Sequence, residues 1–188
     1  MSDFIKEYSD QWGNNPASLL EEYDYHPELT GELDELDVEQ FNYETLYKIV
    51  LWKLSRFPYI TDELVNELKG IKDIQPKEHQ NARDILGKFL RTPGIALPMA
   101  STILRFINPN AFQIIDDRAY RVLLPGKAKY PSKPQKITDS YINKSAEIYF
   151  NYLDRMHEIC SEKLPFDKAD RILYQLDVKL GNKIGEKT

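Results

Sequence analysis

The stretch from Arg91 to Arg121, RTPGIALPMASTILRFINPNAFQIIDDRAYR, decides the fold prediction. It opens with a Pro-Gly pair, continues as an apolar segment, breaks at Asn-Pro, and reaches two aspartates after two isoleucines. Proline and glycine are strong turn formers, and a turn between two helices aims backbone N–H groups at an anion such as a phosphate. The stretch therefore predicts two helices joined by a tight turn, with carboxylates at the start of a further helix.

Outside this stretch, most of the chain has the apolar spacing of amphipathic helices. Helices are expected to begin near Asp3, Pro16, Asn42, Thr61, Lys77, Leu97, Asp116, Thr138 and Phe166. Asn42 and Thr61 are typical N-caps, and residues 97–107, apolar on nearly every side, predict a buried central helix. Residues 124–135 hold three prolines and predict a long loop. With no strand pattern and no repeat, the chain is predicted to be all-α, with two lobes.

Composition excludes several classes of protein. The chain has 188 residues and one cysteine, Cys160, which excludes internal disulfides and zinc or iron–sulfur sites built from cysteines. No apolar run approaches the roughly 20 residues of a membrane helix, and the start, MSDFIKEYSD, lacks a signal-peptide pattern. The histidines form no ligand pattern, and no nucleotide-binding motif is present. We expect a cytoplasmic protein with no cofactor, no metal and no membrane partner.

The net charge of −5 is unevenly distributed along the chain. Residues 1–40 hold 12 acidic residues and one lysine, a balance of −11, whereas residues 41–188 hold 24 basic and 18 acidic residues, a balance of +6. We therefore predict an acidic N-terminal segment, helical or strap-like, over residues 1–40, and a helical domain over residues 41–188. A basic body is compatible with a polyanionic partner; ordinary solvated surface is the alternative.

The turn and the aspartates together resemble the helix-hairpin-helix DNA glycosylase superfamily. The family hairpin is similar to Leu-Pro-Gly-Val-Gly, which is matched here by Thr92, Pro93, Gly94, Ile95 and Ala96. Ala96 stands in place of the second glycine, and Ala100 matches the small residue that packs the two helices together. The resemblance implies a glycosylase-like domain in residues 41–188, with DNA phosphates bound by Pro93, Gly94, Ile95 and Ala96.

Asp116 matches the catalytic aspartate of this family, with Asp117 and Arg118 as auxiliary residues. Cleavage of an N-glycosidic bond builds positive charge on the deoxyribose, which a fixed carboxylate stabilises while it orients the attacking water. An N-cap role for Asp116, ahead of a helix that begins at Asp117, is the alternative interpretation.

The family's lysine nucleophile is replaced here by Pro98, so no lyase chemistry is expected from this hairpin. The resemblance therefore implies a monofunctional DNA glycosylase that acts on duplex DNA with water as the nucleophile. A non-catalytic module that kept the fold and binds DNA or another protein is the alternative.

A basic loop follows the aspartates. Arg121, Lys127, Lys129 and Lys133 are candidates for DNA backbone contacts, with a solvated loop as the alternative. Base flipping also requires aromatic side chains that stack on the extruded base. The candidates, each of which is alternatively a core residue, are Trp52, Phe57, Tyr59, Tyr120 and Tyr130.

Overall fold

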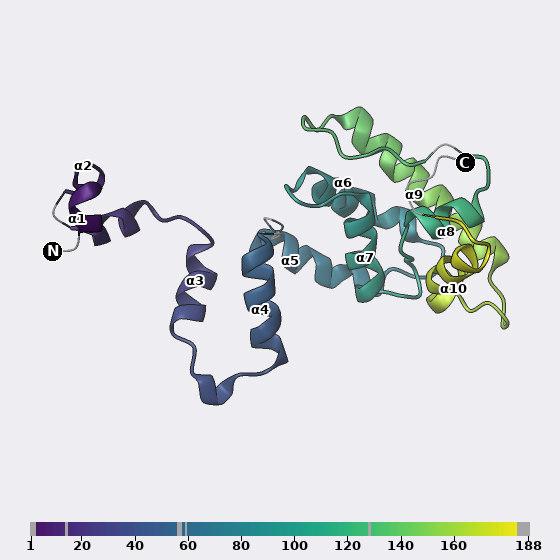
Figure 1. Cartoon of the computed structure of the whole chain (residues 1–188). Helices are drawn as coiled ribbons and strands as arrows, with labels where there is room; N and C mark the ends of the chain where they lie inside the picture. Colours follow the sequence, from purple (N-terminus) through teal and green to yellow (C-terminus); the bar gives the residue numbers. More distant parts are fainter. Residues whose placement is uncertain (1–2, 14, 56–57, 59, 128, 184–188) are drawn as a thin grey trace. The chain divides into compact units, whose positions relative to one another are not determined.

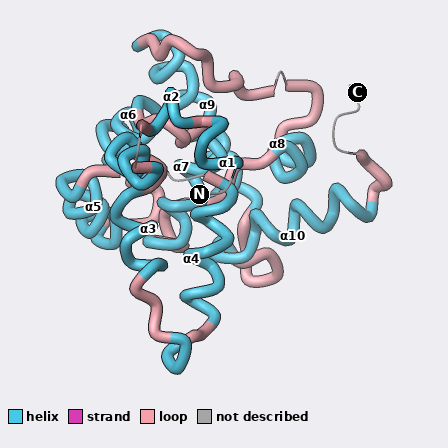
Figure 2. Tube along the Cα trace, turned by 60° about the vertical axis from the view of Figure 1, so that its left-hand side comes forward, coloured by secondary structure: helices cyan, strands magenta, loops and turns pink. Residues whose placement is uncertain are grey.

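The structure is a computed structural model that describes residues 3–13, 15–55, 58, 60–127 and 129–183. In these residues every regular element is a helix (Figure 2), and the single β-bridge pairs Ser161 with Leu164. The all-α prediction is confirmed. The chain forms two compact units, Met1–Phe57 and Pro58–Thr188.

The first unit is a string of short helices. They are α1 (Asp3–Glu7), α2 (Ser9–Trp12), η1 (Pro16–Glu22), α3 (Pro27–Asp34), η2 (Val38–Gln40) and α4 (Tyr43–Leu54). Helices α3 and α4 pack against each other (Figure 1). The indole Nε1 of Trp52 on α4 donates to Thr30 Oγ1 at 2.8 Å, and the Tyr25 hydroxyl donates to the Trp52 carbonyl at 2.9 Å. These bonds tie α4 to α3 and to Tyr25 just before it, in agreement with a unit boundary after α4, whereas the sequence placed a boundary at residue 40.

The second unit surrounds one long helix. Its elements are α5 (Asp62–Leu68), η3 (Lys69–Asp73), η4 (His79–Ala82), α6 (Arg83–Arg91), α7 (Leu97–Ile107), α8 (Asp117–Leu123), α9 (Asp139–Ile159) and α10 (Phe166–Lys179). Helix α9 contacts α6, α8, α10 and η4. Its inner face carries Tyr149, Tyr152, Leu153 and Met156, which are completely buried. Burial of a large side chain contributes about 1.5–3 kcal/mol, so these four side chains contribute substantially to the stability of the second unit.

Helix starts follow the sequence closely. The side chains of Asn42, Thr61 and Thr138 each accept a hydrogen bond from the backbone N–H three residues later, at 3.1, 3.3 and 3.2 Å. Each such cap stabilises its helix by about 1 kcal/mol, since it satisfies an N–H that the helix leaves open. The two predicted caps, Asn42 and Thr61, are confirmed.

Helix α7 differs in part from its prediction as a fully buried helix. Leu97, Ala100 and Leu104 are buried, but Met99 is 50% exposed and Phe106 is 71% exposed. Helix α7 packs on α6 and η3, and its Met99 and Phe106 positions are left exposed. The apolar composition of residues 97–107 therefore predicted more burial than the structure shows.

Candidate functional site

The connection between α6 and α7 is a tight turn. Pro93 and Gly94 occupy its two central positions, and the N–H of Ile95 donates to the carbonyl of Thr92 at 3.2 Å. Gly94 has a φ of +83°, the left-handed conformation that a type II turn requires at this position. Pro93 and Gly94 are exposed, whereas the side chain of Ile95 is fully buried. Any contact of Ile95 with a ligand must therefore use its backbone.

The turn leads directly into the start of α7, which no side chain caps. Ala96 is the N-cap residue, with an extended backbone at a φ of −101° and a ψ of 173°. Alanine adopts this conformation without strain, so the turn needs no second glycine here. Pro98 lacks an N–H, so the N–H groups of Leu97 and Met99 are the donors in the first turn of α7. Such groups attract anions.

Lys133 stabilises this turn through two hydrogen bonds. Its ammonium Nζ donates to the carbonyl of Thr92 at 2.5 Å and to the carbonyl of Ile95 at 2.7 Å. Burial lowers the pKa of Lys133 below its ordinary value. In this structure Lys133 therefore binds the turn itself, whereas the sequence predicted a DNA backbone contact.

The segment from Phe112 to Ile115 carries the chain through the core toward Asp116. The hydroxyl of Tyr149 donates to the carbonyl of Gln113, and that of Tyr152 donates to the carbonyl of Ile114, both at 2.9 Å. The N–H of Ile115 donates to Ser101 Oγ on α7 at 3.1 Å. Burial raises the pKa of both tyrosines well above the usual range, so they remain neutral donors. The segment is thus fixed by α7 and α9.

Asp116 is the N-cap of α8. Its Oδ1 atom accepts from the N–H of Arg118 at 2.9 Å and from the N–H of Ala119 at 2.7 Å. Its Oδ2 atom accepts no hydrogen bond from the part of the chain that the structure describes. Burial raises the pKa of Asp116, while the two N–H bonds oppose that rise. The carboxylate is half-buried, fixed through one oxygen and unbonded at the other.

The Asp117 carboxylate is bonded to two residues of the following loop. Its Oδ2 pairs with the Lys129 ammonium at 2.7 Å, and its Oδ1 accepts from the Tyr130 hydroxyl, also at 2.7 Å. Burial raises the pKa of Asp117, but the bonds from Lys129 and Tyr130 outweigh it and leave the pKa below its ordinary value. Lys129, a predicted DNA contact, is thus paired with a carboxylate.

Arg118 and Arg121 both bind Asp177 on α10. The Arg118 Nη1 atom lies 2.8 Å from Asp177 Oδ2, and Arg121 reaches both carboxylate oxygens, with Nη2 at 2.6 Å and Nε at 2.9 Å. Asp177 is completely buried. Arg118 was predicted to be an auxiliary residue and Arg121 to contact DNA. In the structure both side chains join α8 to α10 through Asp177.

Among the predicted DNA-contacting cations, Lys127 alone has an exposed side chain with no hydrogen bond or ion pair in the residues that the structure describes.

Sequence reasoning missed Asp177 and the hydroxyls of Tyr149 and Tyr152. A lone aspartate late in a helix gives no sequence signal, because its partners lie 56 and 59 residues away.

The three aromatic candidates that the structure describes make contacts within the protein. Tyr120 and Tyr130 are buried and meet edge to face, with ring centroids 5.7 Å apart. Trp52 belongs to the first unit, where it bonds to Thr30. Phe57 and Tyr59 lie outside the described residues. The prediction of a base-stacking aromatic residue remains untested.

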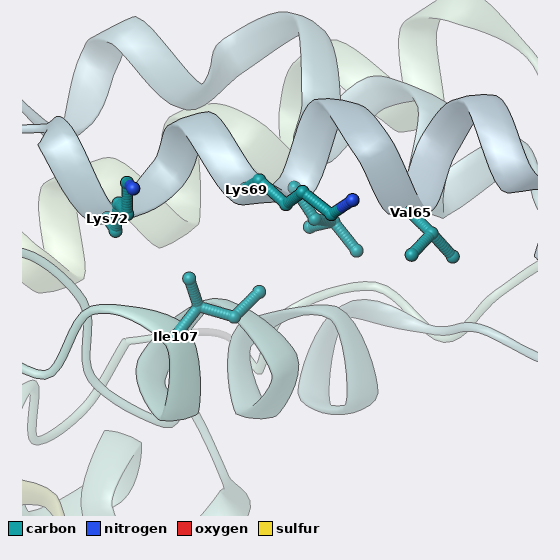
Figure 3. A pocket seen from close by; sticks show the side chains of 5 residues that line it. Val65, Lys69, Lys72 and Ile107 are labelled. Carbon is teal, nitrogen blue, oxygen red and sulfur yellow. The ribbon is translucent and has the colours of Figure 1, made fainter.

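An open groove of about 520 Å³ lies between α5–η3 and α7. Its lining residues are Val65, Leu68, Lys69, Lys72 and Ile107. Figure 3 shows Val65, Lys69 and Lys72 along one side of this groove and Ile107 on the other. None of the predicted site residues lines it, so this groove is separate from Asp116.

In the described ranges, no group of three or more histidine, cysteine, aspartate or glutamate side chains is placed to hold a metal ion. Over the same ranges, no helix is both long and apolar enough to span a membrane. Comparisons with protein-family models, with curated proteins and with solved structures give no match to this chain.

Proposed function

We propose that this chain is a monofunctional DNA glycosylase-like hydrolase that removes a damaged base from duplex DNA with water as the nucleophile. The observation that carries the proposal is the geometry of Asp116. Its carboxylate follows a Pro-Gly turn between two helices, is fixed by two backbone N–H groups at 2.9 and 2.7 Å, and has one oxygen without a hydrogen bond from the residues that the structure describes. Together with the sequence resemblance, this geometry supports a site whose chemistry depends on the carboxylate of Asp116.

The unbonded oxygen is suited to electrostatic catalysis. Bond cleavage at the sugar develops positive charge, and a carboxylate that is already oriented stabilises that charge without reorganising. The same oxygen accepts a hydrogen bond from the attacking water. Because Pro98 occupies the position of the family's lysine nucleophile, the product is an intact abasic site rather than a broken strand.

The turn supplies the contact with DNA in this proposal. The uncapped N–H groups at the start of α7 bind a phosphate without reading the base sequence. Lys127 lies in the loop that follows α8, the helix that Asp116 caps, and adds an exposed positive charge. Because Arg121, Lys129 and Lys133 are bound within the protein, we expect few phosphate contacts and therefore modest affinity with a shallow salt dependence.

A second candidate function is binding of DNA without catalysis. The observation that favours it is that both bonds to Asp116 Oδ1 are helix-capping bonds, which need no catalytic role. Base release by the purified protein separates the two candidates, because binding alone leaves every base attached to its sugar.

The test uses Asp116→Asn, which keeps the shape and the capping oxygen but removes the charge. On duplexes that carry alkylated, deaminated or oxidised bases, we expect the unmodified protein to release a free base and leave no strand break. We expect Asp116→Asn to bind the same duplexes equally well and to release base about a hundredfold more slowly, the usual scale for loss of a preorganised electrostatic group.

The matched control is Asp37→Asn, because Asp37 also caps a helix, with a bond from the N–H of Glu39 at 3.0 Å. This substitution belongs to the first unit and should leave base release unchanged. Normal base release by Asp116→Asn contradicts the site assignment. No base release from any duplex, together with DNA binding, favours the second candidate.

A further inference from the structure

A pair of stacked histidines lies at the joint between η4, α9 and α10. The rings of His79 and His157 are nearly parallel, at an interplanar angle of 13° and a centroid separation of 5.9 Å. His157 also stacks on Phe166, the first residue of α10, at 3.9 Å and 4°. One ring stack therefore joins three elements that are distant in the sequence.

His79 is buried and His157 is partly buried, and both imidazoles make few hydrogen bonds within the described residues. His79 is completely buried; its Nε2 lies 3.1 Å from Asp154 Oδ1, and its Nδ1 makes no hydrogen bond within the described residues. The Nε2 atom of His157 is likewise buried without such a bond. Buried polar atoms without partners are uncommon and costly. Adding a proton to either ring would place a charge beside which, among the described contacts, one carboxylate lies, that of Asp154.

The charges that face the pair are few. Asp154 on α9 lies 3.1 Å from Nε2 of His79, and its own side chain is half exposed. Lys77, just before η4, acts on His157 with the same sign as a ring proton. Arg83 on α6 lies over the ring of Phe150, which His79 also contacts. From α10 the described contact is the uncharged ring of Phe166.

Both histidines are consequently disposed to remain neutral. Burial, then His79 and Lys77, lower the pKa of His157 to about 4. Burial also lowers the pKa of His79, against the opposing effect of Asp154. A histidine whose pKa is lowered by folding stabilises the fold above its unfolded pKa of about 6.5 and loses that contribution as the pH falls.

We propose that His79 and His157 form an acid-sensitive latch, which holds η4 and the beginning of α10 on α9 at neutral pH and releases them when the imidazoles take up protons. Two positive charges less than 6 Å apart, with one partly exposed carboxylate beside them, oppose the stacked arrangement. Release loosens both η4, which leads into α6, and α10, which binds Arg118 and Arg121 through Asp177.

The test is amide hydrogen exchange of the full chain between pH 7.5 and pH 4.5, with rates corrected for the intrinsic effect of pH on exchange. We expect peptides that cover residues 75–82 and 160–170 to lose protection by about tenfold to a hundredfold as the pH falls through 6. A peptide from the middle of α9, residues 145–153, serves as the internal reference and should lose far less.

Two variants isolate the latch. His157→Phe retains a flat ring against Phe166 but cannot be protonated, so we expect it to lose clearly less protection on acidification than the unmodified protein, with His79 as the one ring of the pair that still titrates. His26→Gln removes the remaining histidine, which lies in the first unit, and should behave like the unmodified protein. Equal acid sensitivity in His157→Phe and the unmodified protein, or none in either, overturns the proposal.

A second measurement does not depend on the folding of a variant. In an NMR titration of the unmodified chain, we expect the ring of His157 to titrate well below pH 6. Titration of both His79 and His157 near pH 6.5 would show that the pair is accessible to water and overturns the proposal.

Discussion

Replacement of Asp177 by asparagine should destabilise the second unit by an amount that the structure allows us to work out. Asp177 is completely buried and joins α10 to α8 through Arg118 and Arg121. Asparagine retains the shape of the side chain but removes the charge that both guanidinium groups face. Arg118, whose side chain is 13% exposed, then keeps a positive charge with no carboxylate beside it.

The magnitude follows from the pKa of Asp177. The bond from Arg121 is the largest cause that lowers this pKa, which falls to about 2 although burial opposes the change. Relative to an unfolded value of about 3.9, a difference of nearly 2 pKa units corresponds to about 2.5 kcal/mol at neutral pH. The arginine side chains are 13% and 23% exposed, so water screens part of this interaction. We therefore expect a loss of about 2 kcal/mol.

The sign of the pH dependence is fixed by the same pKa. A carboxylate with a lowered pKa in the folded state stabilises the protein fully above its unfolded pKa and loses the contribution as the pH falls through the folded pKa. The difference in unfolding free energy between the unmodified protein and Asp177→Asn should be largest above pH 5. It should fall to about half by pH 3.

Urea denaturation followed by circular dichroism at pH 7, 4 and 3 measures these differences. The control is Asp139→Asn, because Asp139 pairs with Arg91 on the surface, with side chains that are 84% and 56% exposed. Exposed pairs contribute little, so this change should cost less than about 0.5 kcal/mol. If Asp177→Asn costs no more than Asp139→Asn, or if its cost does not change with pH, the reasoning about the buried carboxylate is refuted.

Three further substitutions test the turn and its supports by urea denaturation at pH 7. Lys133→Met removes the ammonium that bonds to two carbonyls of the turn, so we expect a loss of about 1–3 kcal/mol and weaker DNA binding; unchanged values of both would contradict the clamp. Gly94→Ala places a side chain at a φ of +83° and should cost about 1–2 kcal/mol, whereas no cost would mean that the turn relaxes easily. Asn108→Ala removes a buried amide that donates to the carbonyls of Ile71 and Ile74 at 2.9 and 2.8 Å. We expect a loss of at least about 1 kcal/mol, and a smaller loss would show that water replaces the amide.

Local features of the fold were predictable because their causes are local. Asn42 and Thr61 cap helices through bonds to an N–H three residues away. The Pro93-Gly94 pair specifies its turn through the conformational limits of two neighbouring residues. In each case the sequence contains both partners within one helical turn, and the prediction was right for that reason.

Long-range pairing was not predictable from the same patterns. Nothing in the sequence indicates that Trp52 binds Thr30. The sequence therefore placed the helix that holds Trp52 in the segment 41–188, whereas the contacts in the structure group it with Met1–Phe57. Lys133 reaches carbonyls 41 and 38 residues away, and a carbonyl acceptor has no sequence signature. A charge count also cannot say which cations already have partners. The surplus of basic residues in 41–188 therefore overstates the positive charge available to a polyanion.

The cap and the catalytic interpretation of Asp116 are alternatives in the sequence but are compatible in the geometry. Both backbone bonds end on Oδ1, so capping of α8 leaves Oδ2 without a hydrogen bond in the described part of the chain. The capping bonds also favour the charged form of the carboxylate and fix its orientation, while burial acts against the charge. A carboxylate that is oriented in advance is what stabilisation of a developing positive charge requires. The cap is therefore no argument against the proposed chemistry, and only a substitution that preserves the cap, such as Asp116→Asn, can separate the two roles.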